Sequence, residues 1–401
     1  MQYRKFGKLD WEVSVLGFGA MRMPVIDEDQ ANIDEPEAIR MIRYAADHGV
    51  NYIDTAYLYH MGKSEGLVGK ALKDGYRERM KVTTKLPVRD VEKYGDMDRI
   101  LNEQLERLDM DHIDFYLLHG LNKEGWTKIR DLGVFNWAEK QMAAGLFSRL
   151  GFSFHDDYDV FQEIVDAYDD WVLAQVLYNF MDRDEQAGRR GVEYATGKGL
   201  AVVVMEPLRG GLLGKEPPEP VAREWDTAPR RQKPVEWALQ WVWDQPEISM
   251  LLSGMSTMEQ VVENVEIAGR SRTNMLTGEE LALFDRVRDT YRGLRPVPCT
   301  ACRYCMPCPQ DVDIPGVFQI YNDAVMYDDI RVGKFMYNGG FRVKPEQRAD
   351  KCIVCGECVE KCPQQIAVPD WLAKAHEALY EEVPPPPTSD ENLAEQPGSA
   401  D

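Results

Sequence analysis

The sequence has no apolar run that approaches the roughly 18–20 residues needed to cross a bilayer. Its first residues, MQYRKFGKLDWEV, lack the apolar core of a signal peptide. Positive charge is scarce as well, because 47 Lys and Arg residues stand against 68 Asp and Glu residues and give a net charge of −21. Nucleic acids and anionic membranes select basic surfaces, so neither is an expected partner. We expect a soluble, cytoplasmic protein.

Cysteine is absent from most of the chain, since all eight cysteines lie between Cys299 and Cys362. Disulfides are unusual in an intracellular protein, whereas close and regular cysteine spacing is what metal clusters require. The uneven distribution therefore marks a domain boundary and predicts a separate metal-binding module.

The length of 401 residues and the hydrophobic content of 44% allow a large barrel together with a second, smaller domain. We expect the barrel in residues 1–290 and the cysteine-rich domain in 291–376. Residues 377–401 are acidic and rich in proline, with little to bury, and we expect this tail to be disordered.

Apolar strands and amphipathic helices alternate eight times in about 270 residues, which is the pattern and size of a (β/α)8 TIM barrel. The first strand, VSVLGFGAM, belongs to a segment, Met1–Pro24, that begins with a hairpin expected to close the barrel floor. A doubly wound sheet is the alternative. It is disfavoured because GFGAMR lacks the G-x-G-x-x-G spacing of a dinucleotide-binding turn. Helices are expected near residues 35–48, 64–73, 97–108, 126–144, 160–168, 185–198, 234–243, 258–268 and 279–292.

Polar side chains stand at the ends of successive apolar strands. In Gly49–Glu65, GVNYIDTAYLYHMGKSE, a short strand ends at Asp54, and Tyr59 follows five residues later. Lys85 ends the strand MKVTTKLP, and His119 ends IDFYLLHG. Each of these residues alone is typical of a helix cap, a packed loop or a solvated strand end. Because the carboxyl ends of parallel barrel strands share one face, we expect the four side chains to form one site.

This set of side chains suits carbonyl reduction. A tyrosine hydroxyl titrates near about 10, so a neighbouring cation is needed to lower its pKa if it is to protonate a forming alkoxide. Lys85 can supply that cation, Asp54 can hold the ammonium in place, and His119 can orient the carbonyl by hydrogen bonding. Tyr57 competes with Tyr59 for the role of acid.

Three segments, YIDTAYLYHMGKSE, KVTTKLP and DFYLLH, resemble the active-site segments of the aldo-keto reductases. The resemblance implies a catalytic tetrad of Asp54, Tyr59, Lys85 and His119. It favours Tyr59 over Tyr57, because the five-residue step from Asp54 matches the family. It also implies reduction of an aldehyde, ketone or sugar with NADP or NAD as cofactor.

The same resemblance implies cofactor-binding residues on the later strands. Ser153 and Gln175 would bind the nicotinamide carboxamide, although either could be a satisfied buried polar group. Glu206–Gly214 resembles the loop that closes over the cofactor, and glycine there lets backbone N–H groups approach a pyrophosphate. Ser253–Asn264 resembles the adenosine-binding segment. The residues assigned to the cofactor are Ser153, Gln175, Met205, Pro207, Leu208, Gly210, Ser253, Gly254, Thr257, Gln260, Glu263 and Asn264.

Several positions depart from the family pattern. Met205 stands where an aromatic residue usually stacks on the nicotinamide ring, and Phe154 replaces the Asn that commonly follows the carboxamide-binding Ser. The Lys and Arg that often bind the 2′-phosphate of NADP align with Gly254 and Gln260, which offer only neutral donors. The choice between NADH and NADPH stays open on this evidence, and a flavin is a further alternative.

The cysteines form two runs, Cys299-x2-Cys302-x2-Cys305-x2-Cys308-Pro309 and Cys352-x2-Cys355-x2-Cys358-x3-Cys362-Pro363. The second run is the bacterial ferredoxin pattern. Zinc is the alternative, but zinc sites usually pair two Cys-x2-Cys knuckles and do not run three in a row. The pattern predicts two [4Fe-4S] clusters with all eight cysteines as ligands.

In two-cluster ferredoxins the fourth cysteine of each run binds the other cluster. This resemblance implies one cluster on Cys299, Cys302, Cys305 and Cys362, and a second on Cys352, Cys355, Cys358 and Cys308. The first run is one residue shorter than the ferredoxin spacing before Cys-Pro. The linker 310–351 contains the helical pattern IPGVFQIYNDAVMYDD and resembles the longer dicluster modules of anaerobic oxidoreductases.

The leading hypothesis is an NAD(P)H-dependent carbonyl reductase. Iron–sulfur clusters pass single electrons, whereas nicotinamide moves two as a unit, so direct exchange between them is poor without a flavin. The module could therefore connect the barrel to an external ferredoxin or flavoprotein, or it could brace the barrel. The alternative is an electron-transfer or binding subunit whose barrel no longer performs nicotinamide-dependent reduction. The sequence does not specify the carbonyl substrate.

Overall fold

The computed structural model describes residues 1–340 and 342–381. It divides the chain into two compact units, one formed by Met1–Glu216 and Ala228–Phe284 and the other by Pro217–Thr227 and Asp285–Asp401. The boundary expected after residue 290 falls inside helix α11 (Gly278–Gly293). Each unit is described by itself below.

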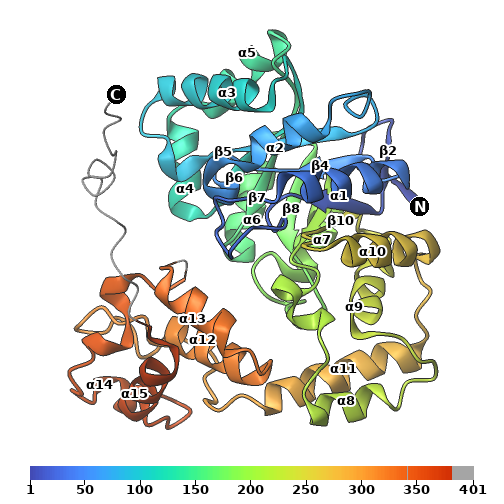
Figure 1. Cartoon of the computed structure of the whole chain (residues 1–401). Coiled ribbons are helices and arrows are strands. Elements are labelled where there is room, and N and C mark those ends of the chain that lie inside the picture. Colours follow the sequence, from blue (N-terminus) through green and yellow to red (C-terminus); the bar gives the residue numbers. More distant parts are fainter. Residues whose placement is uncertain (341, 382–401) are drawn as a thin grey trace, which may run out of the picture. The chain divides into compact units, whose positions relative to one another are not determined.

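Within the described residues, the first unit is a closed barrel of parallel strands in the order β10-β3-β4-β5-β6-β7-β8-β9 (Figure 1). This confirms the predicted TIM barrel and its order of strands along the chain. The strands are β3 (Leu16–Gly19), β4 (Tyr52–Asp54), β5 (Lys81–Pro87), β6 (Ile113–Leu121), β7 (Phe147–Phe154), β8 (Leu173–Leu177), β9 (Ala201–Met205) and β10 (Met250–Ser253).

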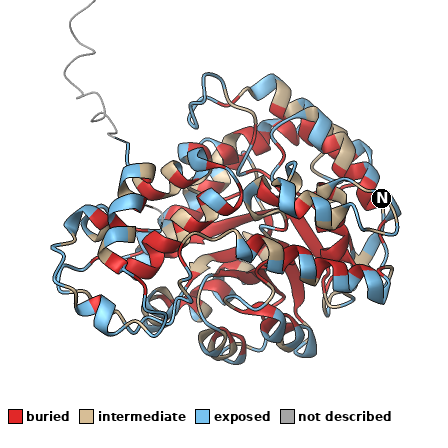
Figure 2. Cartoon of the chain, turned by 90° about the horizontal axis from the view of Figure 1, so that it is seen from below, coloured by how far each residue is buried: buried red, intermediate tan, exposed pale blue. Residues whose placement is uncertain are grey.

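Helices cover the outside of the barrel and bury one face each against the strands, as Figure 2 shows by the red inner and blue outer surfaces. They are α1 (Glu35–Asp47), α2 (Ser64–Ala71), α3 (Tyr94–Leu108), α4 (Lys123–Asp131), α5 (Val134–Ala143), α6 (Tyr158–Asp166), α7 (Gly188–Gly197), α9 (Pro234–Trp243) and α10 (Met258–Arg270). The helical region expected near 126–144 is two helices, because Gly133 adopts a φ of 81° between α4 and α5.

The N-terminal hairpin of β1 (Tyr3–Lys5) and β2 (Glu12–Ser14) closes one end of the barrel, as predicted. Phe6 at its turn is fully buried, and its ring centroid lies 5.2 Å from that of Phe115 and 6.0 Å from that of Tyr52. This apolar plug fills the lower interior. Polar chemistry is therefore confined to the opposite end, where the strands reach their carboxyl termini.

Arg4 on this hairpin donates hydrogen bonds to backbone carbonyls at and after the end of α9. Its Nη1 atom lies 3.1 Å from the Gln245 oxygen and 2.8 Å from the Ile248 oxygen, and Nη2 bonds the Trp243 oxygen. Burial lowers the pKa of Arg4 to about 10, which leaves the guanidinium charged at neutral pH. Helix-end carbonyls without an intrahelical partner need such donors.

We expect an Arg4→Leu variant to lose at least about 2 kcal/mol of barrel stability, because several partly buried carbonyls lose charged donors. Thermal unfolding followed by circular dichroism would measure the shift. Lys5→Leu is the matched control, since Lys5 is exposed on the same strand. Equal melting temperatures for the two variants would contradict the stabilising role of Arg4.

The second unit is helical and contains α8 (Glu219–Trp225), α12 (Ile314–Met326), α13 (Ile330–Asn338), α14 (Glu357–Glu360) and α15 (Val368–Leu379). Its core gathers buried side chains from α12, α13 and α15 together with Cys358, and five further cysteines pack against it, whereas Cys302 and Cys355 are exposed. The helix predicted in the linker is confirmed as α12, whereas α13 and α15 were not anticipated.

Disorder was predicted from residue 377, and this boundary is too early. Helix α15 continues to Leu379, whose side chain packs in the core. The rest of that prediction, from residue 382 onward, lies outside the described residues. None of the helices in the described part of the chain combines the length and apolarity that a bilayer span needs.

Candidate active site and cysteine cavities

The ammonium of Lys85 is the centre of the polar site in the barrel. Lys85 is fully buried at the end of β5, and its Nζ atom lies 2.6 Å from Oδ2 of Asp54, which is only 2% exposed at the end of β4. Nζ also donates to the backbone oxygen of Thr55 at 2.9 Å. Strand β5 pairs with β4 in parallel, so both side chains reach the barrel interior at the same end. The pair is a buried salt bridge with a further hydrogen bond to satisfy the cation.

Tyr59 lies against this ion pair, and Tyr57 does not. Tyr59 opens the short helix η1 (Tyr59–Gly62), and its hydroxyl is 3.3 Å from Nζ of Lys85. The hydroxyl of Tyr57 instead donates to Oε2 of Glu103 at 2.6 Å, and its ring stacks under the guanidinium of Arg107. The geometry therefore places Tyr59, the tyrosine that the resemblance favours, beside the ion pair and Tyr57 away from it.

The protein environment shifts the pKa values of both Tyr59 and Lys85 upward. Burial raises the pKa of Tyr59 above its usual value, and the Lys85 ammonium opposes this without reversing it. Burial alone would lower the pKa of Lys85, but Asp54 and Tyr59 raise it overall. The expectation that Lys85 would leave Tyr59 more acidic than a free tyrosine is thus corrected, because burial outweighs the cation. The phenol is protonated at neutral pH and can donate.

His119 completes the set at the end of β6. Its ring lies edge-on to the Tyr59 ring, with centroids 5.9 Å apart and planes at 80°. Burial, followed by the charge of Lys85, lowers the pKa of His119 well below its usual value. The imidazole is therefore neutral and can offer an N–H donor to a ligand near Tyr59.

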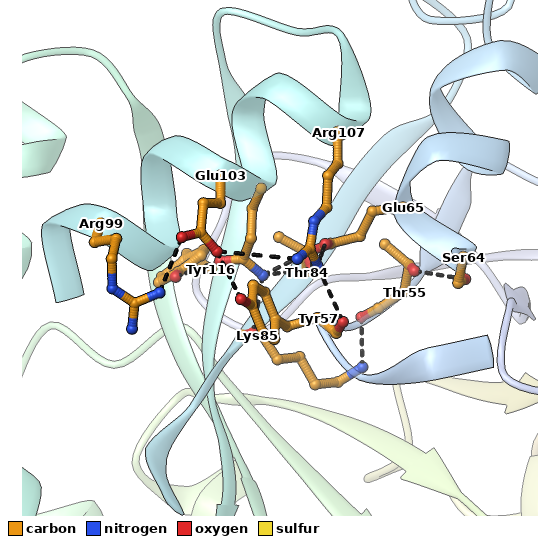
Figure 3. A network of polar contacts seen from close by, with 11 residues as sticks. Thr55, Tyr57, Ser64, Glu65, Thr84, Lys85, Arg99, Glu103, Arg107 and Tyr116 are labelled. Atoms are coloured by element: carbon orange, nitrogen blue, oxygen red, sulfur yellow. Dashed lines mark hydrogen bonds and ion pairs between the residues drawn. The ribbon is translucent and has the colours of Figure 1, made fainter. Parts of the chain in front are cut away.

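A second polar network holds the backbone of β5 from the outside of the barrel (Figure 3). Gln104 on α3 donates from Nε2 to the oxygen of Lys85 at 3.0 Å and to Oε1 of Glu65 at 2.7 Å. Glu65 is fully buried on α2 and also accepts from the Thr84 hydroxyl at 2.6 Å. The Tyr116 hydroxyl donates to Gln104 Oε1 at 2.6 Å. The network fixes the main chain that carries the lysine.

Sequence reasoning missed this network. Gln104 occupies a position on the apolar stripe of α3, among the buried residues Met97, Ile100, Leu101 and Leu108. A polar residue on such a stripe needs a buried partner. That signal was available in the sequence and would have singled out Gln104.

Two polar residues on neighbouring strands fit a carboxamide. Ser153 on β7 and Gln175 on β8 are register partners, and both are buried. The Ser153 hydroxyl accepts a hydrogen bond from Gly120 N at 2.8 Å, and Oε1 of Gln175 has no hydrogen-bond partner among the described residues. A buried amide oxygen without a partner is costly, so it calls for a donor from a ligand. The residues present thus fit the amide group of a nicotinamide.

The other sequence-predicted cofactor residues lie on the loops after β9 and β10. Pro207 is buried, Met205 and Leu208 are partly buried, and Gly210 is exposed in η3 (Arg209–Gly214). Asn264 donates to the Ser253 hydroxyl at 3.0 Å inside the barrel wall. The loop after β9 therefore supplies an exposed glycine, and the segment after β10 supplies a buried hydrogen bond that anchors it.

Three of these predicted residues are engaged within the protein. The Thr257 hydroxyl caps α10 by accepting from Gln260 N at 3.3 Å. Gln260 Oε1 accepts from Ser256 N at 2.7 Å. Glu263 forms an ion pair with Lys233 at 2.6 Å. Gly254 is exposed next to Arg22, a residue that sequence reasoning did not assign to the site.

The cysteines line two cavities in the second unit, and none of the eight forms a disulfide. One cavity is lined by Cys308, Cys352, Cys355 and Cys358, and the other by Cys299, Cys302 and Cys362, while Cys305 borders both. Each cavity thus gathers the cysteines of one implied cluster. Among the described residues, no three His, Cys, Asp or Glu side chains lie close enough to bind a single metal ion. A cubane does not need such a group, because each of its four thiolates binds a different iron atom.

The cavities predict which double substitutions remove one cluster and which remove two. The double variant Cys299→Ser, Cys362→Ser removes two ligands from one cavity, so the iron content is expected to fall by about half. Cys299→Ser with Cys358→Ser strikes both and is expected to remove most of the iron. Iron analysis of protein purified without oxygen measures this difference. Equal iron loss in the two double variants would contradict the partition.

The fold and the two sites define a TIM-barrel enzyme with a buried lysine–carboxylate–tyrosine group and an appended cysteine-rich module. The profile of the Aldo/keto reductase family matches residues 15–288, and that of the 4Fe-4S dicluster domain matches residues 298–367. The chain belongs to the aldo/keto reductase family of oxidoreductases and carries a C-terminal 4Fe-4S domain.

Relatives among known proteins match about two thirds to three quarters of the chain. The chain is 27% identical over 308 residues to the uncharacterized oxidoreductase YrpG of Bacillus subtilis, covering 66% of this chain and 90% of that protein. It is 26% identical to L-galactose dehydrogenase of Arabidopsis thaliana, covering 73% and 96%. The structure resembles the holo form of aldo-keto reductase AKR11C1 from Bacillus halodurans, with a TM-score of 0.60, 27% identity and coverage of 72% and 96%.

A further solved structure contains a nicotinamide cofactor. This is the aldo/keto reductase from Klebsiella pneumoniae in complex with NADP and acetate. Its TM-score is 0.56 and its identity is 25%, and the match covers 71% of this chain and 94% of that one.

Proposed function

We propose that the barrel reduces a carbonyl compound to an alcohol, with NADP or NAD as the cofactor. The observation that carries this proposal is the buried group of Asp54, Lys85 and Tyr59, with His119 beside the phenol. The unpartnered amide oxygen of Gln175 and the neighbouring Ser153 would hold the nicotinamide carboxamide. When bound, the nicotinamide would supply the hydride.

The chain's own residues would carry the proton and position the substrate. A carbonyl oxygen placed between Tyr59 and His119 would accept hydrogen bonds from the phenol and from the neutral imidazole. As negative charge develops on that oxygen, Tyr59 would give up its proton, and the Lys85 ammonium would stabilise the phenolate that forms. Asp54 would keep the ammonium in place and would balance its charge.

The pKa directions predict a flat pH profile for reduction. The pKa values of Tyr59 and Lys85 are raised and that of His119 is lowered. None of these groups then changes its protonation state between about pH 7 and about pH 9. We expect kcat for carbonyl reduction to be constant over this range. A steep change within it, measured with saturating cofactor and substrate, would contradict the assignment.

Nucleotide binding tests the proposal directly. Protein purified without oxygen would be titrated with NADH and with NADPH while nicotinamide fluorescence is followed, and binding of at least one nucleotide is expected. A screen of aldehydes, ketones and sugars would then identify the substrate. If neither nucleotide bound, the reductase proposal would be wrong and an electron-transfer or binding subunit would be favoured.

We also propose that the cysteine cavities hold two [4Fe-4S] clusters that pass single electrons to a ferredoxin or flavoprotein. The lining of the two cavities supports the number of clusters. A Cys352→Ser, Cys355→Ser variant that stays folded would test their role. Loss of ferredoxin-linked turnover with NAD(P)H-linked turnover retained would support a separate electron route. Unchanged turnover in both assays would instead show that the clusters carry no electrons in either reaction and would favour a module that only braces the barrel.

A further inference from the structure

Arg22 places a cation among the loops that follow the last two barrel strands. It lies just after β3, and its side chain is exposed. A Cβ atom at Gly254 would lie 3.3 Å from Cβ, Cγ and Cδ of Arg22, and a Cβ at Gly210 would lie 3.1 Å from its Nη2 atom. The Ser256 hydroxyl donates to the Arg22 backbone oxygen at 2.7 Å. The side chain thus crosses the Gly254 position and reaches the glycine loop.

The guanidinium has no competing partner within residues 1–340 and 342–381, since neither a hydrogen bond nor an ion pair involves it there. The cation that belongs to the glycine loop itself is different. Arg209 is held by Asp182, with Nε 3.0 Å from Oδ2. Arg22 is therefore a cation beside Gly210 that is available to a ligand.

The position of Arg22 points to a phosphate ligand. Barrel enzymes often bind phosphate groups at the loops after their seventh and eighth strands. Here those strands are β9 and β10, and Gly210 and Gly254 stand in the loops that follow them. A guanidinium is planar and can bind two phosphate oxygens at once.

Arg22 can take its observed position because residue 254 is a glycine. A larger residue there would meet the aliphatic part of Arg22 at 3.3 Å and would have to displace it. Gln260 is neutral and already bonds Ser256 N. Positions 254 and 260 carry no positive charge, and the loop after the first barrel strand supplies one through Arg22. The guanidinium of Arg22 lies beside Gly210, whereas its aliphatic part lies beside Gly254.

We propose that Arg22 binds the pyrophosphate of the dinucleotide, at Gly210, and is not a selector of the 2′-phosphate. This inference rests on the proposed function, because it assigns a residue to the cofactor of that reaction. It implies that NADH and NADPH depend on Arg22 to the same extent, since both contain the pyrophosphate.

The test compares dissociation constants of the full-length protein, purified without oxygen, for NADH, NADPH and ADP-ribose. Calorimetry suits all three, and nicotinamide fluorescence suits the first two. Arg22→Gln is expected to weaken each ligand by roughly tenfold or more, because one charge-assisted contact is lost. Arg22→Lys should lose less, since a point charge remains. Arg40→Gln is the matched control, because it removes an exposed cation on the outer face of α1 and should change nothing.

Three results would overturn the inference. They are unchanged affinity of Arg22→Gln for all ligands, weakened binding of NADPH alone, and equal losses in Arg22→Gln and Arg40→Gln. ADP-ribose separates this inference from the proposed function, because it has the pyrophosphate but no nicotinamide. Arg22-dependent binding of ADP-ribose without binding of either reduced nucleotide would support the role of Arg22 and contradict the reductase. Failure of the unmodified protein to bind any of the three would overturn both.

Discussion

A Tyr59→Phe variant is expected to reduce carbonyl substrates roughly 10²- to 10⁴-fold more slowly than the unmodified protein, because it lacks the proton donor. The phenol is 3.3 Å from the Lys85 ammonium and stands edge-on to the His119 ring. Removing one oxygen atom leaves this packing in place, so the affinity for NADH and NADPH should not change. Steady-state kinetics together with a nucleotide titration would measure the two effects separately.

Tyr57→Phe is the matched control for this substitution. Tyr57 is two residues away, and its hydroxyl is occupied by Glu103 outside the ion pair. We expect this variant to keep most of its activity and to lose a little stability. Full activity of Tyr59→Phe, or a larger loss in Tyr57→Phe, would show that the acid has been assigned to the wrong residue.

A Lys85→Met variant is expected to lose about 3–5 kcal/mol of barrel stability at neutral pH, because it leaves the Asp54 carboxylate buried without its cation. Burial already raises the pKa of Asp54 in the intact protein, against the opposing effect of Lys85. Loss of the cation raises that pKa further. A carboxyl group with a raised pKa in the folded state is stable when protonated, and this stability is lost as pH rises through that pKa.

The difference in melting temperature between Lys85→Met and the unmodified protein should therefore narrow as pH falls from 8 toward the raised pKa of Asp54. A protein of two compact units does not unfold as one two-state system, so the barrel transition must be resolved by itself. Adding Asp54→Asn removes the buried charge and should restore most of the lost stability. A double variant no more stable than Lys85→Met, or a difference independent of pH, would contradict the buried ion pair.

The sequence was sufficient to predict the barrel because its signals are local. Each strand is a short apolar run, and Asp54, Lys85 and His119 lie near the carboxyl ends of their strands, so the topology alone brings them to one face. The cysteine runs were equally informative, because ligand spacing reflects the geometry of the cluster.

Other features depend on three-dimensional contacts that no local pattern reveals. The net pKa of Tyr59 is set by how deeply the phenol is buried, which spacing cannot give. Arg22 lies in GFGAMR, which carries no local motif for a phosphate, and its proximity to Gly210 and Gly254 arises from barrel closure between β3 and β10. The division between α4 and α5 depends on one glycine with a positive φ.

The outer network of Glu65 and Gln104 has a consequence for redesign of substrate scope. These side chains anchor the backbone of the lysine strand from helices α2 and α3, on the far side of the barrel wall from the ligand. Within the described part of the chain, loops at the mouth contribute none of the bonds that Glu65 and Gln104 make to β5. New loop sequences could be exchanged there to accept different carbonyl compounds, while Gln104→Leu would impair turnover for every substrate alike.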